Sequence, residues 1–448
     1  MGKLITTFRN IGKIEDLKKR LLYTLGLVLI YRLGSFIVLP GIDPEGLTAL
    51  KSQTSTGLLG LLNMFSGGAF SNASIFALGI MPYISASIVI QLLGLAIPYF
   101  QKLQREGESG RRRLNQITRL LTIVIVALQA PAYMANVLRQ VPAGYIIPFD
   151  PAVATPPTFF FVSSVIILIA GTMFVMWLGE RITDNGIGNG ISLLIMIGII
   201  ARLPFALVGE FVAKANAQGG GLVIFLIELL VWIVVIMLCI LLVQGTRKIP
   251  VQYAKRVVGN RQYGGVRQYI PLKVNAAGVM PIIFAQAIMF LPMTIAGFGS
   301  ENMGKFAATF SNINGFWYNF VFFILIVLFT YFYTAITVNP TQMAEGVKPG
   351  KRTAEYIDTI MSKITLPGSI FLGIIAILPA IVRLFGVNTQ FAQFFGGTSL
   401  LILVGVVLDT LQQIESHLLM RHYDGLMKTG RVKGRSATGV EGYDQSAI

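Results

Sequence analysis

Residues 74–93 read SIFALGIMPYISASIVIQLL, a run of 20 residues without a charged side chain. An α-helix needs about 20 apolar residues to cross a hydrocarbon core of about 30 Å. Gly79 and Pro82 weaken this helix, which also contains Ser85 and Gln91. Small and polar side chains at membrane depth belong at contacts between helices or against water, not against lipid. The stretch is therefore predicted to cross a membrane inside a bundle of helices.

The composition of the whole chain also indicates a membrane protein. Apolar residues make up 54% of the 448 residues, charged residues make up 12%, and the mean hydropathy is +0.70. A soluble domain normally carries about 25% charged residues. A surface this apolar needs lipid around it. The single cysteine, Cys239, excludes a disulfide and a cysteine-based metal site within one chain, and no metal site is expected.

Ten apolar runs, separated by Gly, Pro and charged residues, are predicted to be spanning helices. They lie at residues 21–39, 73–97, 117–137, 158–178, 187–208, 222–243, 274–298, 316–338, 367–385 and 394–413. Ahead of them, apolar residues recur at helical spacing in residues 1–20, which predicts an amphipathic helix on the membrane surface. The run at 21–39 is too long for the apolar region of a signal peptide and is expected to remain as the first span.

The basic residues predict which side of the membrane each loop faces. When the loops are numbered from the N-terminus, one side carries 29 of the 36 Lys and Arg residues. Cytoplasmic loops are enriched in these residues. Both termini, including the tail at 415–448, are therefore predicted to be cytoplasmic, which requires an even number of spans and agrees with ten.

The loop at 246–273 holds seven Lys and Arg residues and no acidic residue. In one interpretation its charge serves topology and contact with anionic lipid. In the other it docks a polyanionic partner such as ribosomal RNA, because the loop is longer than topology needs and carries Tyr253, Tyr263 and Tyr269. The sequence leaves both interpretations open.

A second informative stretch, residues 177–194, reads WLGERITDNGIGNGISLL. Gly186, Gly188 and Gly190 predict a flexible turn at the cytoplasmic end of a span. The turn is not a phosphate-binding loop, because no strand precedes it and no Lys-Ser/Thr pair follows it.

Both stretches resemble the two by which members of the SecY family are recognised. Further pieces match in the same order: EGESGRRR at 106–113, YAKR at 253–256, PLKVNAAGVMP at 271–281 and GGTSLLI at 396–402. The resemblance implies an all-α polytopic membrane protein with ten transmembrane helices around a central pore. These would form two inverted five-helix halves, residues 21–209 and 210–414, with a short plug helix.

The function implied by the resemblance is a channel in the bacterial cytoplasmic membrane, not an enzyme. Unfolded secretory polypeptides would cross it, and transmembrane segments would leave it sideways into lipid. No cofactor is expected. The implied partners are SecE-like and SecG-like small membrane subunits, the SecA motor ATPase and the ribosome. Either the motor ATPase or the translating ribosome would supply the energy. A secondary transporter is the alternative class, but it would need a charged or ion-coordinating site near the midplane.

The family's aliphatic constriction maps onto six isoleucines. They are Ile80, Ile84, Ile191, Ile195, Ile283 and Ile402. Ile80 and Ile84 are four residues apart and so share a helix face. The same spacing separates Ile191 from Ile195. A narrow apolar collar excludes ions by dewetting, yet offers a passing polypeptide no strong binding site.

The resemblance also implies a plug and a lateral gate. The apolar segment 57–72 is too short to span and falls where the family has its plug. Its predicted plug residues are Gly57, Leu61, Asn63, Phe65, Gly67 and Gly68, whose glycines permit close packing. The gate would open between the second and third spans on one side and the seventh and eighth on the other. Ser85, Gln129 and Asn275 are the expected polar cluster there.

Basic residues of two cytoplasmic loops are the expected docking sites for cytosolic partners. They are Arg247, Lys248, Lys255, Arg256, Lys348, Lys351 and Arg352. In the loop at 339–366, Lys348 stands where the family typically has an arginine. The positive charge is kept, but the bidentate hydrogen bonding of a guanidinium group is lost. Two charges in or near spans have open roles. Glu228 could face a partner subunit or point outward, and Arg32 could pair with Glu228 or with the lipid interface.

Overall fold

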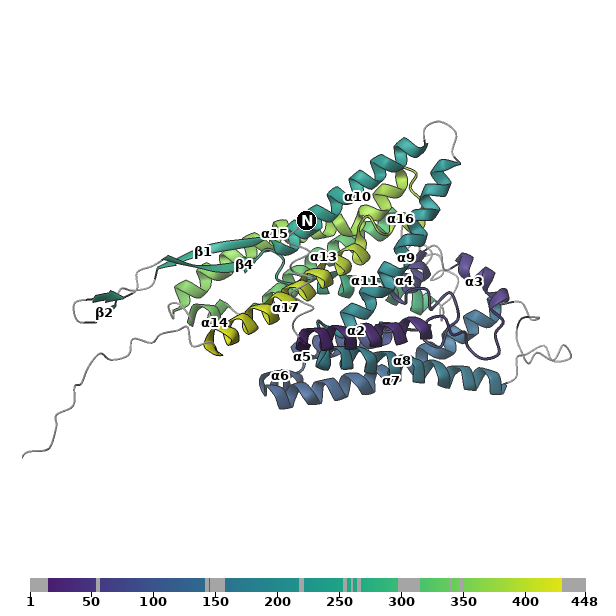
Figure 1. The fold of residues 1–448 in the computed structure, drawn as a ribbon, viewed down its shortest axis with the longest axis horizontal. Coiled ribbons are helices and arrows are strands. Elements are labelled where there is room, and N and C mark those ends of the chain that lie inside the picture. Colours follow the sequence, from purple (N-terminus) through teal and green to yellow (C-terminus); the bar gives the residue numbers. More distant parts are fainter. Residues whose placement is uncertain are drawn as a thin grey trace, which may run out of the picture.

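The computed structural model describes residues 15–53, 57–141, 145, 158–216, 221–252, 256–258, 261–263, 267–296, 315–338, 340–345 and 350–428. The N-terminal part forms α2 (Glu15–Gly34), the 3-10 turn η1 (Pro44–Leu47), α3 (Thr48–Gln53), α4 (Gly57–Phe65), α5 (Met81–Ala96), α6 (Pro98–Arg105), α7 (Glu108–Gln140), α8 (Thr158–Asn185) and α9 (Gly190–Ala215). The C-terminal part forms α10 (Gly221–Gln244), β1 (Thr246–Gln252), β2 (Arg256–Val258), β3 (Arg261–Tyr263), β4 (Arg267–Lys273), α11 (Met280–Ala296), α13 (Phe316–Thr337), α14 (Pro340–Glu345), α15 (Lys351–Leu384), α16 (Thr389–Ala392) and α17 (Gly397–Lys428). Figure 1 shows the two parts as neighbouring groups of helices.

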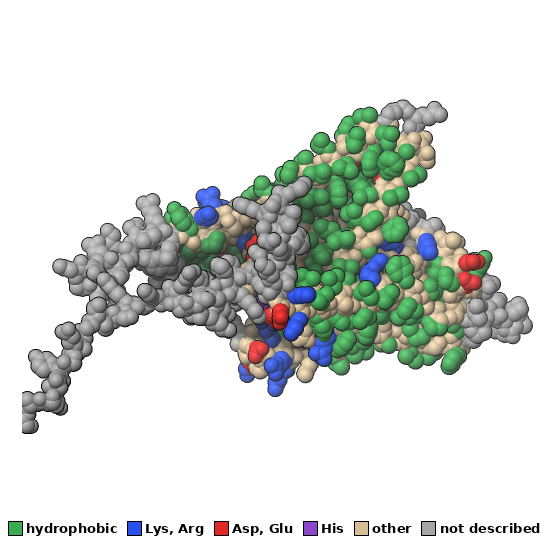
Figure 2. Space-filling view, in the orientation of Figure 1, with side chains coloured by type: hydrophobic (Ala, Val, Ile, Leu, Met, Phe, Trp, Pro, Cys, Tyr) green, Lys and Arg blue, Asp and Glu red, His purple; other side chains and the backbone are tan. Residues whose placement is uncertain are grey.

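Each predicted span coincides with a helix, and the expectation of an all-α polytopic membrane fold is confirmed. Seven helices of the described part are long and apolar enough to cross a membrane by themselves. The bent pair of α5 and α6, with an angle of 103°, would make an eighth span. The other two predicted spans fall on α2, which carries six charged residues, and on α11, which has only 17 residues. In Figure 2, apolar side chains cover the flanks of the bundle.

The second span begins later than expected. The prediction starts at residue 73, whereas α5 begins at Met81. Pro82 occupies the first turn of this helix, where its missing N–H removes no helical hydrogen bond. The chain before it makes turns, with Gly79 at a φ of +54°, and these turns connect the helix to α4. The predicted amphipathic helix at 1–20 lies mostly outside the described residues, since α2 starts at Glu15.

Three large apolar clusters hold the bundle together. One lies within the N-terminal part and includes Val126 and Met134 of α7. A second lies mainly within the C-terminal part and includes Ile282 of α11 and Ile326 of α13. The third joins the two parts, because it contains residues of α2, α4, α8 and α9 together with residues of α16 and α17. We call this third cluster the seam.

The predicted cytoplasmic loop at 246–273 is a β-ribbon. Strand β1 pairs antiparallel with β4, from Thr246 opposite Lys273 to Gln252 opposite Arg267. The shorter strands β2 and β3 continue the ribbon, which projects from the bundle (Figure 1). The ribbon was not predicted from the sequence, although alternation of polar and apolar residues through Ile249 is typical of a half-buried strand.

The base of the ribbon packs on the second predicted loop. Ile249 and Leu272 share a small apolar cluster with Ile357 and Met361 of α15. Helix α15 starts at Lys351 and is 34 residues long, so much of the segment predicted as a loop at 339–366 is helical. The two basic regions are therefore parts of one platform at one end of the bundle.

A buried ionic network joins the two parts near the connection between α9 and α10. The Lys214 ammonium lies 2.9 Å from a carboxylate oxygen of Glu228 and 3.7 Å from one of Glu210. Lys214 also donates a hydrogen bond to the Gly386 carbonyl, and the Asn388 N–H donates one to Glu210. Glu210 and Lys214 belong to α9, whereas the other three residues lie beyond it. The open question about Glu228 is thus answered: its partner is Lys214, not Arg32.

Replacing the lysine of this network is expected to destabilise the bundle. Lys214→Met leaves two buried carboxylates without their cation, and loss of one partner of a buried pair costs about 3 kcal/mol. The double variant Lys214→Met/Glu228→Gln should recover part of that loss. The matched control is Arg20→Met, which breaks an exposed pair with Asp16. The measurement is thermal unfolding in detergent, and equal shifts for Lys214→Met and Arg20→Met would contradict the expectation.

Candidate functional site

The six predicted ring isoleucines lie together in the seam. Ile80, Ile195 and Ile402 are each only 5% exposed and belong to its buried core. The other three, Ile84, Ile191 and Ile283, are partly buried and pack against that core. They come from α5, α9, α11 and α17 and from the residue just before α5, so both parts of the chain contribute. Residues separated by more than 300 positions in sequence thus meet in one apolar cluster.

The predicted plug segment is a nine-residue helix, α4, followed by turns. Its residues Met64 and Phe65 are buried in the seam with the ring isoleucines. Gly67 and Gly68 follow the helix at φ values of +64° and +95°, a backbone conformation that favours glycine. The Gly68 N–H donates to the Asn63 carbonyl and so closes the last turn. Gly57 is the first residue of α4, and the side chain of Leu61 is not among those described.

Two arginines hold the turns that follow α4. The Arg32 guanidinium donates a hydrogen bond to the Gly67 carbonyl at 3.1 Å. The Arg202 guanidinium donates one to the Ser71 hydroxyl at 3.1 Å. Arg32 belongs to α2 and Arg202 to α9, so the turns are fixed from two sides. The open role of Arg32 is therefore a contact with the plug segment, supplemented by stacking over the ring of Phe36.

Two tyrosines and an asparagine also hold the turns after α4. We call these three side chains, together with Arg32 and Arg202, the clamp. Tyr133 of α7 donates its hydroxyl to the Phe70 carbonyl at 2.8 Å. Tyr31 of α2 donates to the Ser66 carbonyl at 3.4 Å. The Asn63 side chain accepts the N–H of Ser71 at 3.0 Å. In hydrocarbon an unpaired backbone group is costly, and these bonds satisfy the polar groups of the irregular segment.

The plug segment also meets α9 at very close range. A Cβ atom on Gly198 would lie 2.7 Å from the Phe65 carbonyl oxygen. A Cβ atom on Gly67 would lie 2.9 Å from the Gly198 Cα atom. Such distances are too short for real Cβ contacts with backbone, so glycine at both positions permits this approach.

The glycine turn between α8 and α9 is held by side chains of α2 and α17. The Gly188 N–H donates to the Gln413 side chain of α17 at 2.8 Å. The Ile187 N–H donates to the Thr24 hydroxyl of α2 at 3.2 Å. Asn189 caps α9 by accepting the N–H groups of Ile191 and Ser192. The turn fixes the start of α9, from which the two ring positions of that helix follow directly.

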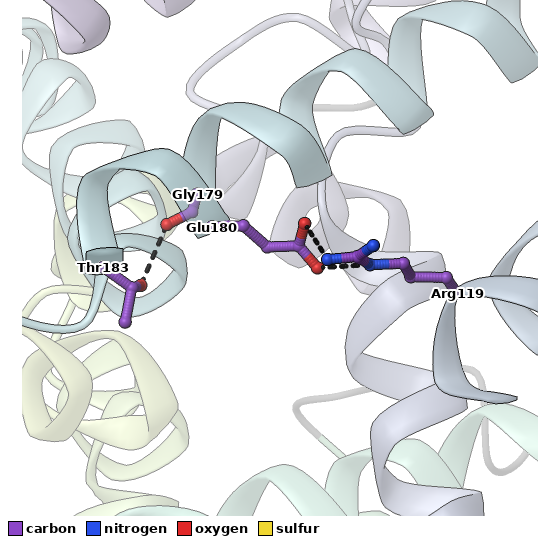
Figure 3. Close-up of polar contacts among 4 residues, drawn as sticks. All are labelled: Arg119, Gly179, Glu180 and Thr183. Atoms are coloured by element: carbon purple, nitrogen blue, oxygen red, sulfur yellow. Dashed lines mark hydrogen bonds and ion pairs between the residues drawn. The ribbon is translucent and has the colours of Figure 1, made fainter. Parts of the chain in front are cut away.

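Helix α8, which leads into this turn, is fixed to α7 by an ion pair. Arg119 donates two hydrogen bonds to the Glu180 carboxylate, both at 2.8 Å (Figure 3). Thr183, one turn further along α8, donates to the Gly179 carbonyl (Figure 3). The Thr183 hydroxyl also accepts the Gly190 N–H. The bidentate geometry orients the two helices relative to one another.

The predicted lateral-gate residues make local contacts. Ser85 donates to the Met81 carbonyl in its own helix. The Asn275 side chain donates to the Gly278 carbonyl, and its oxygen has no hydrogen-bond partner in the described part of the chain. Gln129 is exposed on α7. Among the described residues, no hydrogen bond joins these three side chains, so their role as one polar cluster remains a prediction.

The predicted docking residues lie on the platform of ribbon and α15. Arg247 and Lys248 are exposed on β1, and Lys351 and Arg352 are exposed in the first turn of α15. Arg256 belongs to β2, and its side chain is not among those described. Lys255 and Lys348 lie outside the described residues.

The comparisons with known proteins agree with this geometry. A family model described as SecY matches residues 74–411. The chain belongs to the SecY family. Its relatives include the protein translocase subunit SecY of Streptomyces scabiei, 42% identical over 95% of this chain and 100% of the relative. That of Chlamydia trachomatis is 39% identical over 96% of this chain and 100% of the relative.

Solved structures share the fold of this SecY-family chain. One is described as a protein conducting channel, with a TM-score of 0.57, 16% identity, and coverage of 93% of this chain and 95% of that chain. Another is Sec61 in the canine ribosome-channel complex from the endoplasmic reticulum, with a TM-score of 0.56, 16% identity and the same coverage. At this identity the likeness shows the fold alone.

The sequence of this SecY-family chain did not predict that two arginines hold the turns after α4. Arg202 is one of the few basic residues on the side with less positive charge, and its partner Ser71 is 131 positions away. The available signal was an arginine within an apolar run, since such a residue is costly unless it finds polar partners. Gly198 gave no signal beyond its small size.

A methyl group on Gly198 is expected to displace the plug segment. Overpacking against a backbone oxygen costs about 1–3 kcal/mol, which raises the population of a displaced α4 by at least about fivefold. The readout is the thiol-labelling rate of Met64→Cys, at a side chain now 4% exposed, in a Cys239→Ser background. Gly209→Ala is the matched control, because a Cβ atom there meets nothing within 4 Å. Equal labelling rates in the two alanine variants would contradict the expectation.

Proposed function

We propose that this chain forms a protein-conducting channel whose constriction is the ring of six isoleucines in the seam. The observation that carries the proposal is their shared cluster: isoleucines from both parts of the chain belong to one buried apolar cluster. Unfolded secretory polypeptides would pass through the ring, and transmembrane segments would leave between the two parts into lipid.

An aliphatic constriction suits this task physically. Three of the ring isoleucines are only 5% exposed, which supports a narrow passage at the ring. Apolar walls also keep water out of a narrow passage, which excludes ions by dewetting. A polypeptide can part these side chains because they offer it no hydrogen bonds or charges to hold it. We therefore propose that the present conformation is a closed one.

Helix α4 is proposed to be the plug. It is short, ends in two glycines, and packs its apolar residues Met64 and Phe65 against the ring. The polar bonds from Arg32 and Arg202 lie on the turns behind the helix rather than on the helix itself. The plug could then move as a unit once those few bonds are exchanged for water.

The basic platform is proposed to dock cytosolic partners. Lys351 and Arg352 occupy the N-terminal turn of α15, where the helix dipole disfavours cations. An anionic partner surface would offset that penalty, which supports a ribosome or a motor ATPase such as SecA at this platform. The solved canine Sec61 is itself part of a ribosome-channel complex. SecE-like and SecG-like subunits are proposed as further partners in the membrane.

The setting proposed for the channel is the bacterial cytoplasmic membrane, with both termini in the cytoplasm. The bacterial relatives and the predominance of Lys and Arg on one side support this orientation. The basic platform then faces the cytoplasm, and the clamp on the plug segment lies toward the opposite side.

Site-specific crosslinking of an arrested secretory chain tests the proposed function. A photoreactive residue at Ile84 or Ile191 should form adducts with the arrested chain, because both positions line the proposed path. The matched control is Leu230 of α10, which is 63% exposed on the flank of the bundle and should crosslink to lipid. Adducts at Leu230 but not at the two isoleucines would contradict the proposal.

A further inference from the structure

A cavity of about 60 Å³, lined by both apolar and polar residues, lies inside the C-terminal part, away from the ring. It is bounded by α11, α13, α15, α16 and the start of α17. A buried water needs about 10–15 Å³ by this kind of measure, so the cavity has room for several atoms of that size. Nothing in the proposed ring, plug or docking platform uses it.

One wall of the cavity carries an unsatisfied hydrogen-bond donor. Gln286 of α11 is only 4% exposed, and its side-chain nitrogen has no partner in the described part of the chain. A buried amide without a partner costs free energy, and an acceptor in the cavity would remove that cost. A ligand that carries hydrogen-bond acceptors would therefore pair with the Gln286 side-chain nitrogen.

Two further features make the cavity attractive to a negative charge. Arg383, in the last turn of α15, is one of its lining residues and carries a positive charge. The 32-residue helix α17 begins at the cavity wall, where Gly397, Thr398 and Ser399 form its first turn. The first N–H groups of a helix have no partner within the helix and carry the positive end of its dipole. Among the described lining residues there is no Asp or Glu.

The outer edge of the cavity lies where a membrane places its headgroups. Arg383 is next to Leu384 and Phe385, which are 86% and 78% exposed at the end of α15. On the neighbouring helix α13, Phe316 and Trp317 are also exposed at its first turn. Exposed aromatic residues at the ends of spanning helices mark the level of the lipid headgroups. A headgroup could thus reach Arg383 from the lipid side.

We propose that this cavity binds the phosphate of an anionic phospholipid, with Arg383, the Gln286 amide and the first turn of α17 as its ligands. The phosphate oxygens supply the acceptors that all three groups lack. Because Gln286 belongs to α11 and Ser399 to α17, a bound phosphate would link two helices that also carry ring isoleucines. The inference goes beyond the proposed function and does not depend on it.

The test measures lipid retention by the intact, delipidated complex in detergent. Native mass spectrometry follows titration with phosphatidylglycerol, with phosphatidylcholine and with inorganic phosphate. Arg383→Gln and Gln286→Leu are each expected to remove one tightly held phosphatidylglycerol, weakening its binding by about tenfold. Phosphatidylcholine, which has no net charge, should bind this site more weakly than phosphatidylglycerol.

Arg139→Gln is the matched control, because Arg139 is also in the last turn of a spanning helix but is exposed and does not line the cavity. It should retain the same number of phosphatidylglycerol molecules as the unchanged chain. If all three variants retain the same number, the proposal is overturned. Displacement of the lipid by millimolar inorganic phosphate would overturn the lipid as the source of the phosphate. Persistence of the lipid under that challenge supports it.

Discussion

The structure depends on an apolar contact between two groups of helices that lipid does little to drive together. Hydrocarbon tails are as apolar as isoleucine, so burial of the seam yields little net association compared with the same contact in water. The seam must instead be held by close packing and by a few polar links. Two of these are the bond from Gly188 to Gln413 and the ion pair of Lys214 with Glu228. They join the turn before α9 to α17, and α9 itself to α10.

This distribution of forces explains how one molecule can be sealed and still able to open. The ring and the buried face of α4 make contacts that cost little to exchange for contacts with another chain. The irregular turns after α4 carry polar groups; Tyr31, Arg32 and Tyr133 satisfy three of their carbonyls, and Arg202 bonds the Ser71 hydroxyl. Displacing the plug therefore requires those groups to find water. The seal and its release thus rest on different kinds of interaction.

The sequence predicted the parts of this account that depend on local pattern. Apolar runs predicted the helices, and spacing of four predicted that Ile191 and Ile195 share a face of α9. The meeting of six isoleucines was inferred from a family resemblance, since no local rule brings α5 and α17 together. The β-ribbon was missed because its alternation is short, and the Arg202–Ser71 contact was missed because it is long-range. Lys214 and Glu228 could not be paired from sequence, as they lie on different helices.

The conductance of the resting complex in planar bilayers tests the apolar seal most directly. Ile195→Asn together with Ile402→Asn hydrates the ring, so steady ion conduction without any secretory chain is predicted. Ile200→Asn on the same helix, at a side chain 42% exposed away from the seam, should leave the membrane as tight as the unchanged complex does. Absence of ion conduction in the double variant, or conduction in Ile200→Asn equal to that of the double variant, would contradict the account.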